Sequence, residues 1–197
     1  MSHKINIAII KYNAGNIRSV DFALRRLGCV PVITNDHSVI NKADKVIFPG
    51  VGEAGTTMKY LRERGLDKLI RELRQPVLGI CLGMQLLCSF SEESETECIG
   101  VFDVSVKKFG AEEKVPHMGW NTIHKVGGEI IPDEMDGKYF YFVHSYYTPV
   151  CSHTAAVTNY IHPFSSVLER DNFFATQFHP EKSGLTGEEL LKTFISI

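Results

Sequence analysis

Four short apolar runs, separated by helical or polar segments, constrain the fold of this chain more than any other feature. They occupy residues 5–10, 30–34, 45–49 and 75–80. Amphipathic helical patterns accompany them at 16–28 and 54–73, and Gly65 is expected to break the second helix. Continuous apolar runs are typical of strands buried on both faces, which helical crossovers join in parallel. The first half therefore predicts an α/β fold with a mostly parallel central sheet.

The second half predicts strands rather than helices. Strand-like pieces with turn signals between them lie at residues 101–109, 137–148, 154–160, 165–171 and 173–181. A last helix is expected at 186–196, and the acidic segment 91–97 is interpreted as a solvated turn. Because the sequence shows no internal repeat or linker, residues 1–197 are interpreted as a single three-layer α/β domain with antiparallel additions.

The bulk composition excludes several classes of protein. The 197 residues carry a net charge of −2, which gives no electrostatic footprint for nucleic acid or for an anionic membrane surface. No apolar stretch approaches the roughly 18 residues of a membrane span. The first residues read as a strand rather than a signal peptide, so a cytoplasmic protein is expected.

Cysteine and histidine usage argues against a metal centre. The five cysteines form no C-x-x-C pair, and the eight histidines form no cluster with them. An odd cysteine count without a secretion signal indicates reduced thiols. We therefore expect no metal and no cofactor.

Residues 79–83, G-I-C-L-G, place a cysteine between two glycines at the end of the fourth apolar run. The pattern has the shape of the G-x-S-x-G nucleophile elbow, with cysteine in place of serine. A sharp strand-to-helix turn would lift Cys81 clear of the sheet, where side chains at both glycine positions would collide. The following helix would favour the thiolate, and the Leu82 N–H would be placed to stabilise an oxyanion. Cys81 is therefore the candidate nucleophile.

A cysteine nucleophile needs a base, and the base needs a group that orients it. Residues 179–181 read H-P-E. Proline favours an extended path, in which side chains two residues apart project to the same side, so Glu181 is expected to orient His179. His144 is the rival base, but its aromatic surroundings indicate a satisfied strand histidine, and no carboxylate follows two residues later.

Three glycines raise a different possibility. Gly50, Gly52 and Gly55 match the G-x-G-x-x-G spacing of dinucleotide-binding sites. Such glycines normally lie in the first strand-to-helix turn, and an acidic residue ends the next strand. Here they follow the third apolar run, and the next run leads to Cys81. We therefore interpret them as serving other chemistry, and keep a nucleotide-binding protein as an alternative.

Taken together, G-x-C-x-G, H-P-E and an upstream P-G-x-G at 49–52 resemble the class I glutamine amidotransferases over essentially the whole chain. Residues 114–121, 141–147 and 177–184 are more closely similar to the glutaminase subunits of histidine biosynthesis. The resemblance implies a flavodoxin-like fold and a Cys81, His179 and Glu181 triad that hydrolyses glutamine through a thioester. The chain has no phosphate-cradling loop, and the resemblance implies a (β/α)₈-barrel cyclase subunit that accepts the ammonia in a heterodimer.

The resemblance assigns roles to further residues. It places residues 49–52 as a strand that faces the nucleophile. Our own hypothesis is that the Val51 N–H joins that of Leu82 in the oxyanion hole only when the partner is engaged, because the flanking glycines permit a peptide flip. The residues implied in glutamine binding are Gly50, Gly52, Gln85, Glu93, Ser145 and Tyr146. The residues expected to face the partner are Asn13, Asn16, His117, Met118, Trp120 and Asn121, with Trp120 as the typical anchor type.

Two further alternatives stay open. A related amidotransferase, for anthranilate or for surface-sugar amidation, would share the triad. Residues 116–121 and 141–147 argue against the anthranilate type and less against the sugar type. A non-catalytic binding module on the same fold is the alternative from another class, and covalent labelling of Cys81 would separate it from an enzyme.

Overall fold

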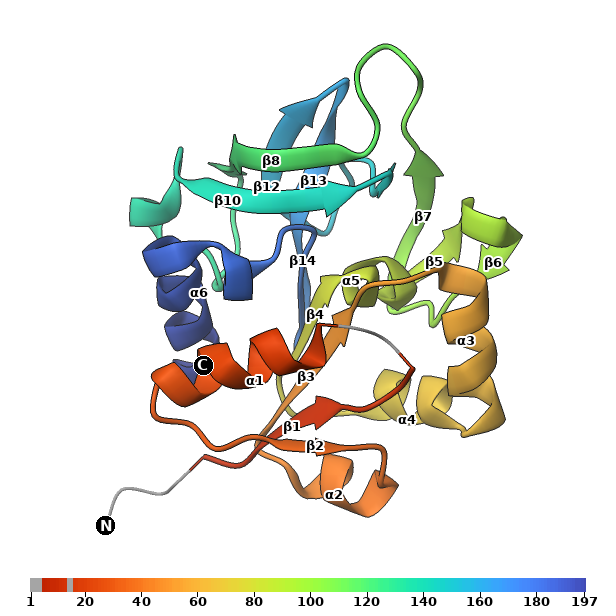
Figure 1. Cartoon of the computed structure of the whole chain (residues 1–197), viewed down its shortest axis with the longest axis vertical. Helices are drawn as coiled ribbons and strands as arrows, with labels where there is room; N and C mark the ends of the chain where they lie inside the picture. The colour runs from red at the N-terminus through yellow and green to blue at the C-terminus, as the bar shows by residue number, and fades with distance from the viewer. Residues whose placement is uncertain (1–4, 14–15) are drawn as a thin grey trace.

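The computed structural model describes residues 5–13 and 16–197, and an eight-stranded sheet runs through it (Figure 1). Its strands are, in spatial order, β2 (Val32–Thr34), β1 (Ile7–Ile10), β3 (Lys45–Gly50), β4 (Val77–Cys81), β14 (Phe173–Thr176), β13 (His162–Arg170), β12 (Thr154–Tyr160) and β9 (His124–Lys125). The first five are parallel and the last three join antiparallel. The parallel part has the flavodoxin-like order, as predicted.

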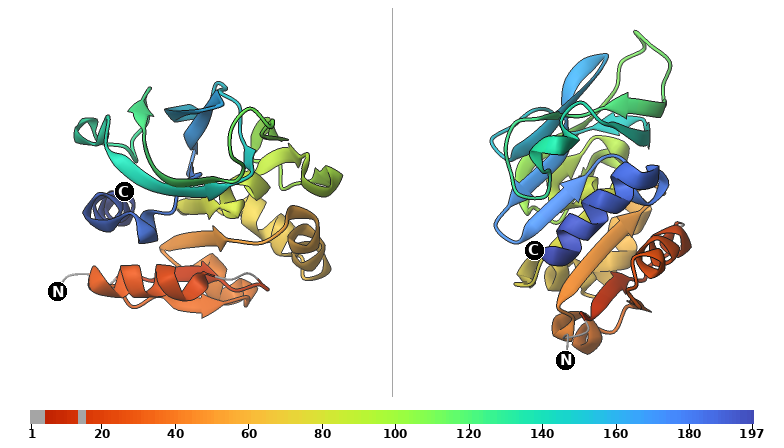
Figure 2. Two further views of the ribbon diagram at one scale, coloured as in Figure 1. Left: turned by 45° about the horizontal axis from the view of Figure 1, so that its top comes forward. Right: turned by 90° about the vertical axis from the view of Figure 1, so that its left-hand side faces the viewer.

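The central strands bury opposite faces with alternate residues. Ile7 and Ile9 pack into one apolar core, and Ala8 and Ile10 pack into the other. Helices α1 (Ile17–Arg26) and α6 (Gly184–Ser196) cover the first face, and α3 (Ala54–Glu63), α4 (Leu66–Glu72) and α5 (Leu82–Leu87) cover the second (Figure 2). Each fully buried isoleucine contributes about 1.5–3 kcal/mol. The predicted three-layer α/β arrangement is confirmed.

The helix boundaries follow local chemistry. The Glu53 carboxylate accepts the backbone N–H groups of Gly55 and Thr56 and so caps α3. Gly65, in the left-handed conformation, separates α3 from α4, which confirms the predicted break. The sequence did not predict the short helix α2 (His37–Lys42), which buries only Ile40.

Two smaller sheets form the additions, one of them antiparallel and the other mixed. One is a ribbon of β8 (His117–Thr122) and β10 (Tyr139–His144). The other contains β11 (Tyr146–Tyr147), β7 (Phe102–Lys108), β5 (Cys88–Ser91) and β6 (Thr96–Glu97). Three 3-10 turns complete the elements within residues 5–13 and 16–197: η1 (Glu93–Glu95), η2 (Asp133–Met135) and η3 (Pro180–Lys182).

The acidic segment 91–97 differs from the solvated turn that we expected. Ser91 and Thr96 are buried, and they pair with each other across the β5–β6 ladder. The acidic side chains between them belong mostly to η1. The charge pattern hid a small paired structure because only Ser91 and Thr96 are covered, while the acidic residues between them stay exposed or half-buried.

The arrangement of the sheet places the site. The carboxyl ends of β3, β4 and β14 lie at the same edge, with Gly50 beside Cys81 and Thr176 beside Ile80. The segment after β14 is tied to the β8–β10 ribbon by a 2.9 Å hydrogen bond from His179 N to Tyr141 O. Ligands of open α/β sheets bind outside the carboxyl ends of the strands, and the motifs gather here.

In the described ranges no helix is long and apolar enough to cross a membrane.

Candidate active site

Cys81 lies at the turn that joins β4 to α5. Its backbone has φ 54° and ψ −108°, which a non-glycine residue rarely adopts. A Cβ on Gly83 would lie 1.9 Å from Phe48 O, and a Cβ on Gly79 would lie 2.8 Å from a methyl carbon of Leu87. The expected sharp turn is therefore present, and the two flanking glycines are required by close packing.

His179 and Glu181 form the expected pair. His179 Nδ1 lies 2.8 Å from Glu181 Oε1, and both side chains are fully buried. The predicted extended path was wrong, because Pro180 begins the 3-10 turn η3, and this turn carries Glu181 beside the ring. The fixed φ of proline suits the first position of such a turn as well as an extended chain. Asn16 Nδ2 donates to the same Oε1 from the start of α1.

The charge of His179 is set by its neighbours. Burial alone would lower the pKa of His179, but the Cys81 sulfur and the Glu181 carboxylate raise it to about 10. The ring is therefore an imidazolium at neutral pH. Its Nε2 has no hydrogen-bond partner within residues 5–13 and 16–197. This N–H can donate a proton to a leaving group, which is what a general acid requires.

The rival base His144 is already engaged. Its Nδ1 lies 2.7 Å from Tyr146 O, and its Nε2 lies 3.0 Å from His117 Nδ1. Burial is the main reason that the pKa of His144 falls to about 3, so the ring is neutral. The prediction of a satisfied strand histidine is confirmed.

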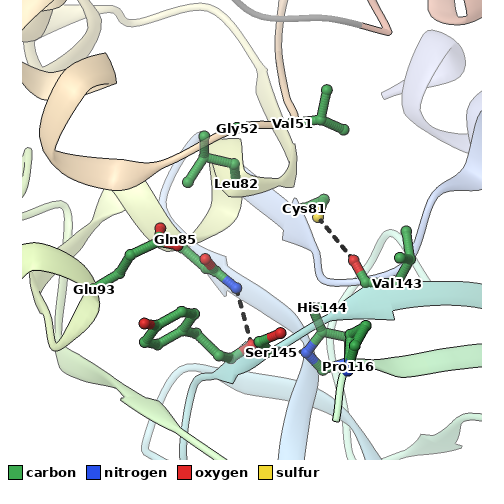
Figure 3. A pocket seen from close by; sticks show the side chains of 11 residues that line it. Val51, Gly52, Cys81, Leu82, Gln85, Glu93, Pro116, Val143, His144 and Ser145 are labelled. Atoms are coloured by element: carbon green, nitrogen blue, oxygen red, sulfur yellow. Dashed lines mark hydrogen bonds between the residues drawn. The ribbon is translucent and has the colours of Figure 1, made fainter.

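A cavity of about 330 Å³ opens in front of Cys81 (Figure 3). Its size is typical of small-molecule sites. The Cys81 sulfur lies 3.9 Å from the Val143 carbonyl oxygen, which the dashed line in Figure 3 marks. The residues that line the cavity are Val51, Gly52, Cys81, Leu82, Gln85, Glu93, Pro116, Val143, His144, Ser145 and Tyr146.

The cavity gathers all but one of the residues expected to bind glutamine or form the oxyanion hole. The exception is Gly50, which is buried at the end of β3 and is not part of the cavity lining. A Cβ on Gly50 would lie 2.5 Å from Tyr12 Oη and 2.8 Å from Leu82 Cβ. The missing side chain of Gly50 therefore makes room for Tyr12 and for the turn at Leu82, and its place beside the substrate stays a prediction.

Glu93 is held in place by the start of α3. Its Oε2 accepts the backbone N–H of Ala54 at 2.8 Å. The pKa of Glu93 is raised, chiefly by burial, with Glu53 adding to the rise. The carboxylate lines the cavity at the opposite end from His144, as Figure 3 shows, so one polar group is available far from the nucleophile.

The residues expected at a partner interface fall into two groups. Met118 and Trp120 on β8 are 62% and 56% exposed, so a core tryptophan is excluded, and Asn13 is also exposed. His117 is buried, and its side chain does not reach the surface that we expected it to share. The outcome follows from strand alternation, because Met118 and Trp120 face one side of β8 and His117 faces the other.

Asn16 and Asn121 belong to neither group. Both are half-buried, and both use their side-chain amides inside the protein. Asn16 donates to Glu181, so it supports the His179–Glu181 pair from a segment that lies far away in the sequence.

Sequence reasoning missed two residues beside the triad. Tyr12 is buried and its hydroxyl donates to Pro49 O, which anchors the strand that leads to Val51. Gln177 is fully buried, and its Nε2 lies 3.7 Å from the Cys81 sulfur. A signal for Gln177 was present, because it precedes His179 by two residues on the extended approach to η3. Nothing local in the sequence points to Tyr12.

No metal centre is formed by the residues that the structure describes. Among them, no group of three or more His, Cys, Asp or Glu side chains could hold an ion.

Comparison with known proteins gives a consistent result. The chain matches the family described as glutamine amidotransferase class-I over residues 8–197. It is 60% identical over 196 residues to imidazole glycerol phosphate synthase subunit HisH of Bacteroides thetaiotaomicron, covering 98% of this chain and 100% of that protein. It is 48% identical over 198 residues to the protein of the same name from Yersinia pestis, with the same coverage.

Solved structures agree on the fold. A structure described as a glutamine amidotransferase has a TM-score of 0.75 at 19% identity, covering 96% of this chain and 97% of that one. A glutamine amidotransferase from Thermotoga maritima has a TM-score of 0.65 at 16% identity, covering 98% of this chain and 84% of that one. At these identities the likeness concerns the fold alone.

Proposed function

Because this chain belongs to the class-I glutamine amidotransferase family, we propose that it is the glutaminase subunit of an imidazole glycerol phosphate synthase in histidine biosynthesis. The observation that carries the proposal is 60% identity over 98% of this chain and 100% of a protein of that name. That identity favours the histidine pathway over the anthranilate and surface-sugar alternatives. As part of the proposal, residues 1–197 form one amidotransferase domain that works in the cytoplasm.

The first half of the reaction forms a thioester. Cys81 reacts as the thiolate: its sulfur attacks the side-chain amide carbon of glutamine, and the carbonyl electron pair moves onto oxygen. The N–H groups of Leu82 and Val51 are the proposed donors to that oxyanion. His179 Nε2–H gives its proton to the amide nitrogen, the carbon–nitrogen bond breaks, and ammonia leaves.

The second half restores the enzyme. His179, now neutral, accepts a proton from water through Nε2 while the water oxygen attacks the thioester carbon. The carbon–sulfur bond breaks and glutamate leaves. Glu181 keeps the ring oriented through the 2.8 Å contact at Nδ1 in both halves. Glutamine and water are consumed, and glutamate and ammonia are produced.

The ammonia then passes to a second polypeptide. In neutral water ammonia is mostly ammonium, which is not a nucleophile, so transfer has to occur in a closed path. We propose that the partner is a (β/α)₈-barrel cyclase. It would use the ammonia to convert a phosphoribulosyl-formimino nucleotide into imidazole glycerol phosphate and aminoimidazole carboxamide ribotide. The exposed Met118 and Trp120 provide an apolar surface for such a partner.

An ammonia-release assay tests this function. Purified chain is incubated with glutamine alone, then with a barrel cyclase, then with the cyclase and its nucleotide ligand. We expect little turnover alone and stimulation in the liganded complex, because uncoupled hydrolysis wastes glutamine. Equal turnover in all three conditions would refute the proposed coupling. Growth of a histidine auxotroph that lacks this subunit, restored by the chain, would separate the histidine pathway from surface-sugar amidation.

A further inference from the structure

Two buried histidines beside the cavity have no role in the proposed reaction. His117 on β8 and His144 at the end of β10 are direct partners in the ladder of this ribbon. The His117 ring stacks on Tyr160, with ring centroids 4.0 Å apart. The edge of the Phe164 ring packs near His144, with centroids 5.1 Å apart. Burying polar rings among aromatic side chains carries a desolvation cost that apolar residues would avoid. Hydrogen bonds of the two rings have to offset this cost.

Asn121 fixes the direction of these hydrogen bonds. Its Oδ1 accepts the Thr122 N–H at 2.8 Å, and its Nδ2 lies 3.1 Å from Asn159 O. A flipped amide would put donor against donor at one contact and acceptor against acceptor at the other. The amide therefore presents Nδ2 to His117 Nε2, 3.3 Å away, and this ring nitrogen is an acceptor.

The remaining protons then have one consistent placement. A neutral ring carries one N–H, so His117 holds its proton on Nδ1 and donates it to His144 Nε2 at 3.0 Å. His144 in turn holds its proton on Nδ1 and donates it to Tyr146 O at 2.7 Å. Burial keeps both rings neutral, since it lowers the pKa of His117 to about 4 and is the main cause that lowers that of His144 to about 3.

The Tyr146 carbonyl is a junction between this chain of hydrogen bonds and the nucleophile. It also accepts from Gln85 Nε2 at 3.0 Å, and the same nitrogen lies 3.0 Å from Gln177 Oε1. Gln177 Nε2 lies 3.7 Å from the Cys81 sulfur. His144 and Gln85 therefore hold the Tyr146 carbonyl from two sides. Because Ser145 and Tyr146 line the cavity, these two donors fix the backbone of one cavity wall.

We propose that His117 and His144 are positioning residues that hold the Ser145–Tyr146 wall of the glutamine pocket through one directed chain of hydrogen bonds. The inference rests on the proposed function, because it assigns this wall to glutamine. The histidines touch neither Cys81 nor His179 in any of the hydrogen bonds described, so their contribution is to substrate affinity rather than to the chemical step.

The tautomers give a direct test that needs no substrate. The full chain is labelled with ¹⁵N in histidine, and long-range nitrogen–proton correlations are recorded at pH 7. We expect His117 and His144 both to be neutral with the proton on Nδ1, whereas neutral histidine free in water favours Nε2. A proton on Nε2 of either ring would overturn the directed chain. The His144→Ala and His117→Ala spectra assign the two signals.

Affinity labelling tests the effect on the pocket. A chloroketone analogue of glutamine alkylates Cys81, and its concentration dependence separates binding from the limiting rate of reaction. We expect His144→Ala to raise the half-saturating concentration about tenfold and leave the limiting rate unchanged, because one charge-free hydrogen bond to the wall is lost. His144→Asn keeps an N–H near the Nδ1 position and should recover most of this affinity.

His162→Ala is the matched control, because His162 is exposed and lies outside the cavity lining. It should label like the wild type. If wild-type Cys81 is not alkylated, the proposed function fails and the inference fails with it. If wild-type Cys81 is alkylated and His144→Ala shows the same half-saturating concentration, the positioning role alone is refuted. An equal loss in His144→Ala and His144→Asn would likewise refute it.

Discussion

His179 holds a positive charge where its side chain has no contact with water. Such a charge is tolerated because the Cys81 sulfur and the Glu181 carboxylate, 2.8 Å away, both favour it, and because Asn16 donates to the same carboxylate oxygen. The arrangement satisfies one side of the ring and leaves Nε2 without a partner in the described part of the chain. The pair therefore combines a fixed ring with a proton that can leave.

The raised pKa of His179 has a consequence for stability. A histidine with a pKa of about 10 in the folded state and about 6.5 when unfolded stabilises the fold fully below pH 6.5, and the contribution is lost as pH rises to about 10. Glu181→Gln removes one cause of the shift. We expect its free energy of unfolding to fall less steeply across this window than that of the wild type. Urea unfolding at several pH values measures both slopes, and parallel slopes would contradict the assignment.

Glu181→Gln should also show whether Glu181 orients the His179 ring or binds glutamine. Glu181→Gln keeps the shape of the side chain but weakens the hold on the ring and on its charge. We expect kcat for glutamine hydrolysis to fall about 100-fold or more, with a small change in KM. Steady-state kinetics of the activated enzyme measure the split. A rise in KM at constant kcat would place Glu181 in substrate binding instead.

At the scale of elements, the β4–α5 turn depends on the absence of a side chain at Gly83. A Cβ there would lie 1.9 Å from Phe48 O, which belongs to the backbone of β3 and has no room to move. We expect Gly83→Ala to destabilise the protein by about 3 kcal/mol. Gly127→Ala is the matched control, because nothing lies within 4 Å of its added Cβ and its φ suits other residues. If Gly83→Ala and Gly127→Ala unfolded at the same urea concentration, the packing argument would be refuted.

Local sequence patterns predict the elements that carry a continuous apolar run or a regular apolar stripe. Strands β1, β3 and β4 and the helices on either side were predicted because each buries a continuous run or stripe. The edge strand β2 was also predicted, but the expected burial on both faces was wrong there, because Val32 and Ile33 are exposed. Helix α2 was missed because six residues with one buried side chain carry no period. The path at residues 179–181 was wrong because proline permits both an extended chain and a 3-10 turn, and packing against α6 decides between them.

The site was predictable to the same limited extent. Motifs predicted Cys81 as the nucleophile and paired His179 with Glu181, because strand ends and neighbouring residues are local information. The contacts of Asn16 with Glu181, and of Gln85 with Gln177, join segments that only the folded sheet brings together. The sequence also does not reveal that Tyr12 lies beside Gly50, where an added Cβ would be 2.5 Å from the Tyr12 hydroxyl.

At the scale of the whole molecule, we expect that glutamine hydrolysis and the cyclase reaction can be separated by mutation. In the complex with the cyclase, Cys81→Ala should abolish glutamine-dependent synthesis and spare synthesis from added ammonium salts, because only the source of ammonia is lost. Product formation with each nitrogen source measures this. Wild-type complex provides the reference for both sources. Loss of both activities in the variant would contradict a division of labour between subunits.

The position of β14 in the sheet also has a consequence for how the protein is made. In the part of the chain that the structure describes, β14 is the last strand in sequence, yet it lies between β4 and β13. A nascent chain on the ribosome presents two open strand edges until residue 176 has been synthesised, and open edges invite aggregation. His179 and Glu181 follow immediately. Closing those edges and adding His179 and Glu181 are thus nearly one event, so under the proposed mechanism an unfinished chain cannot hydrolyse glutamine.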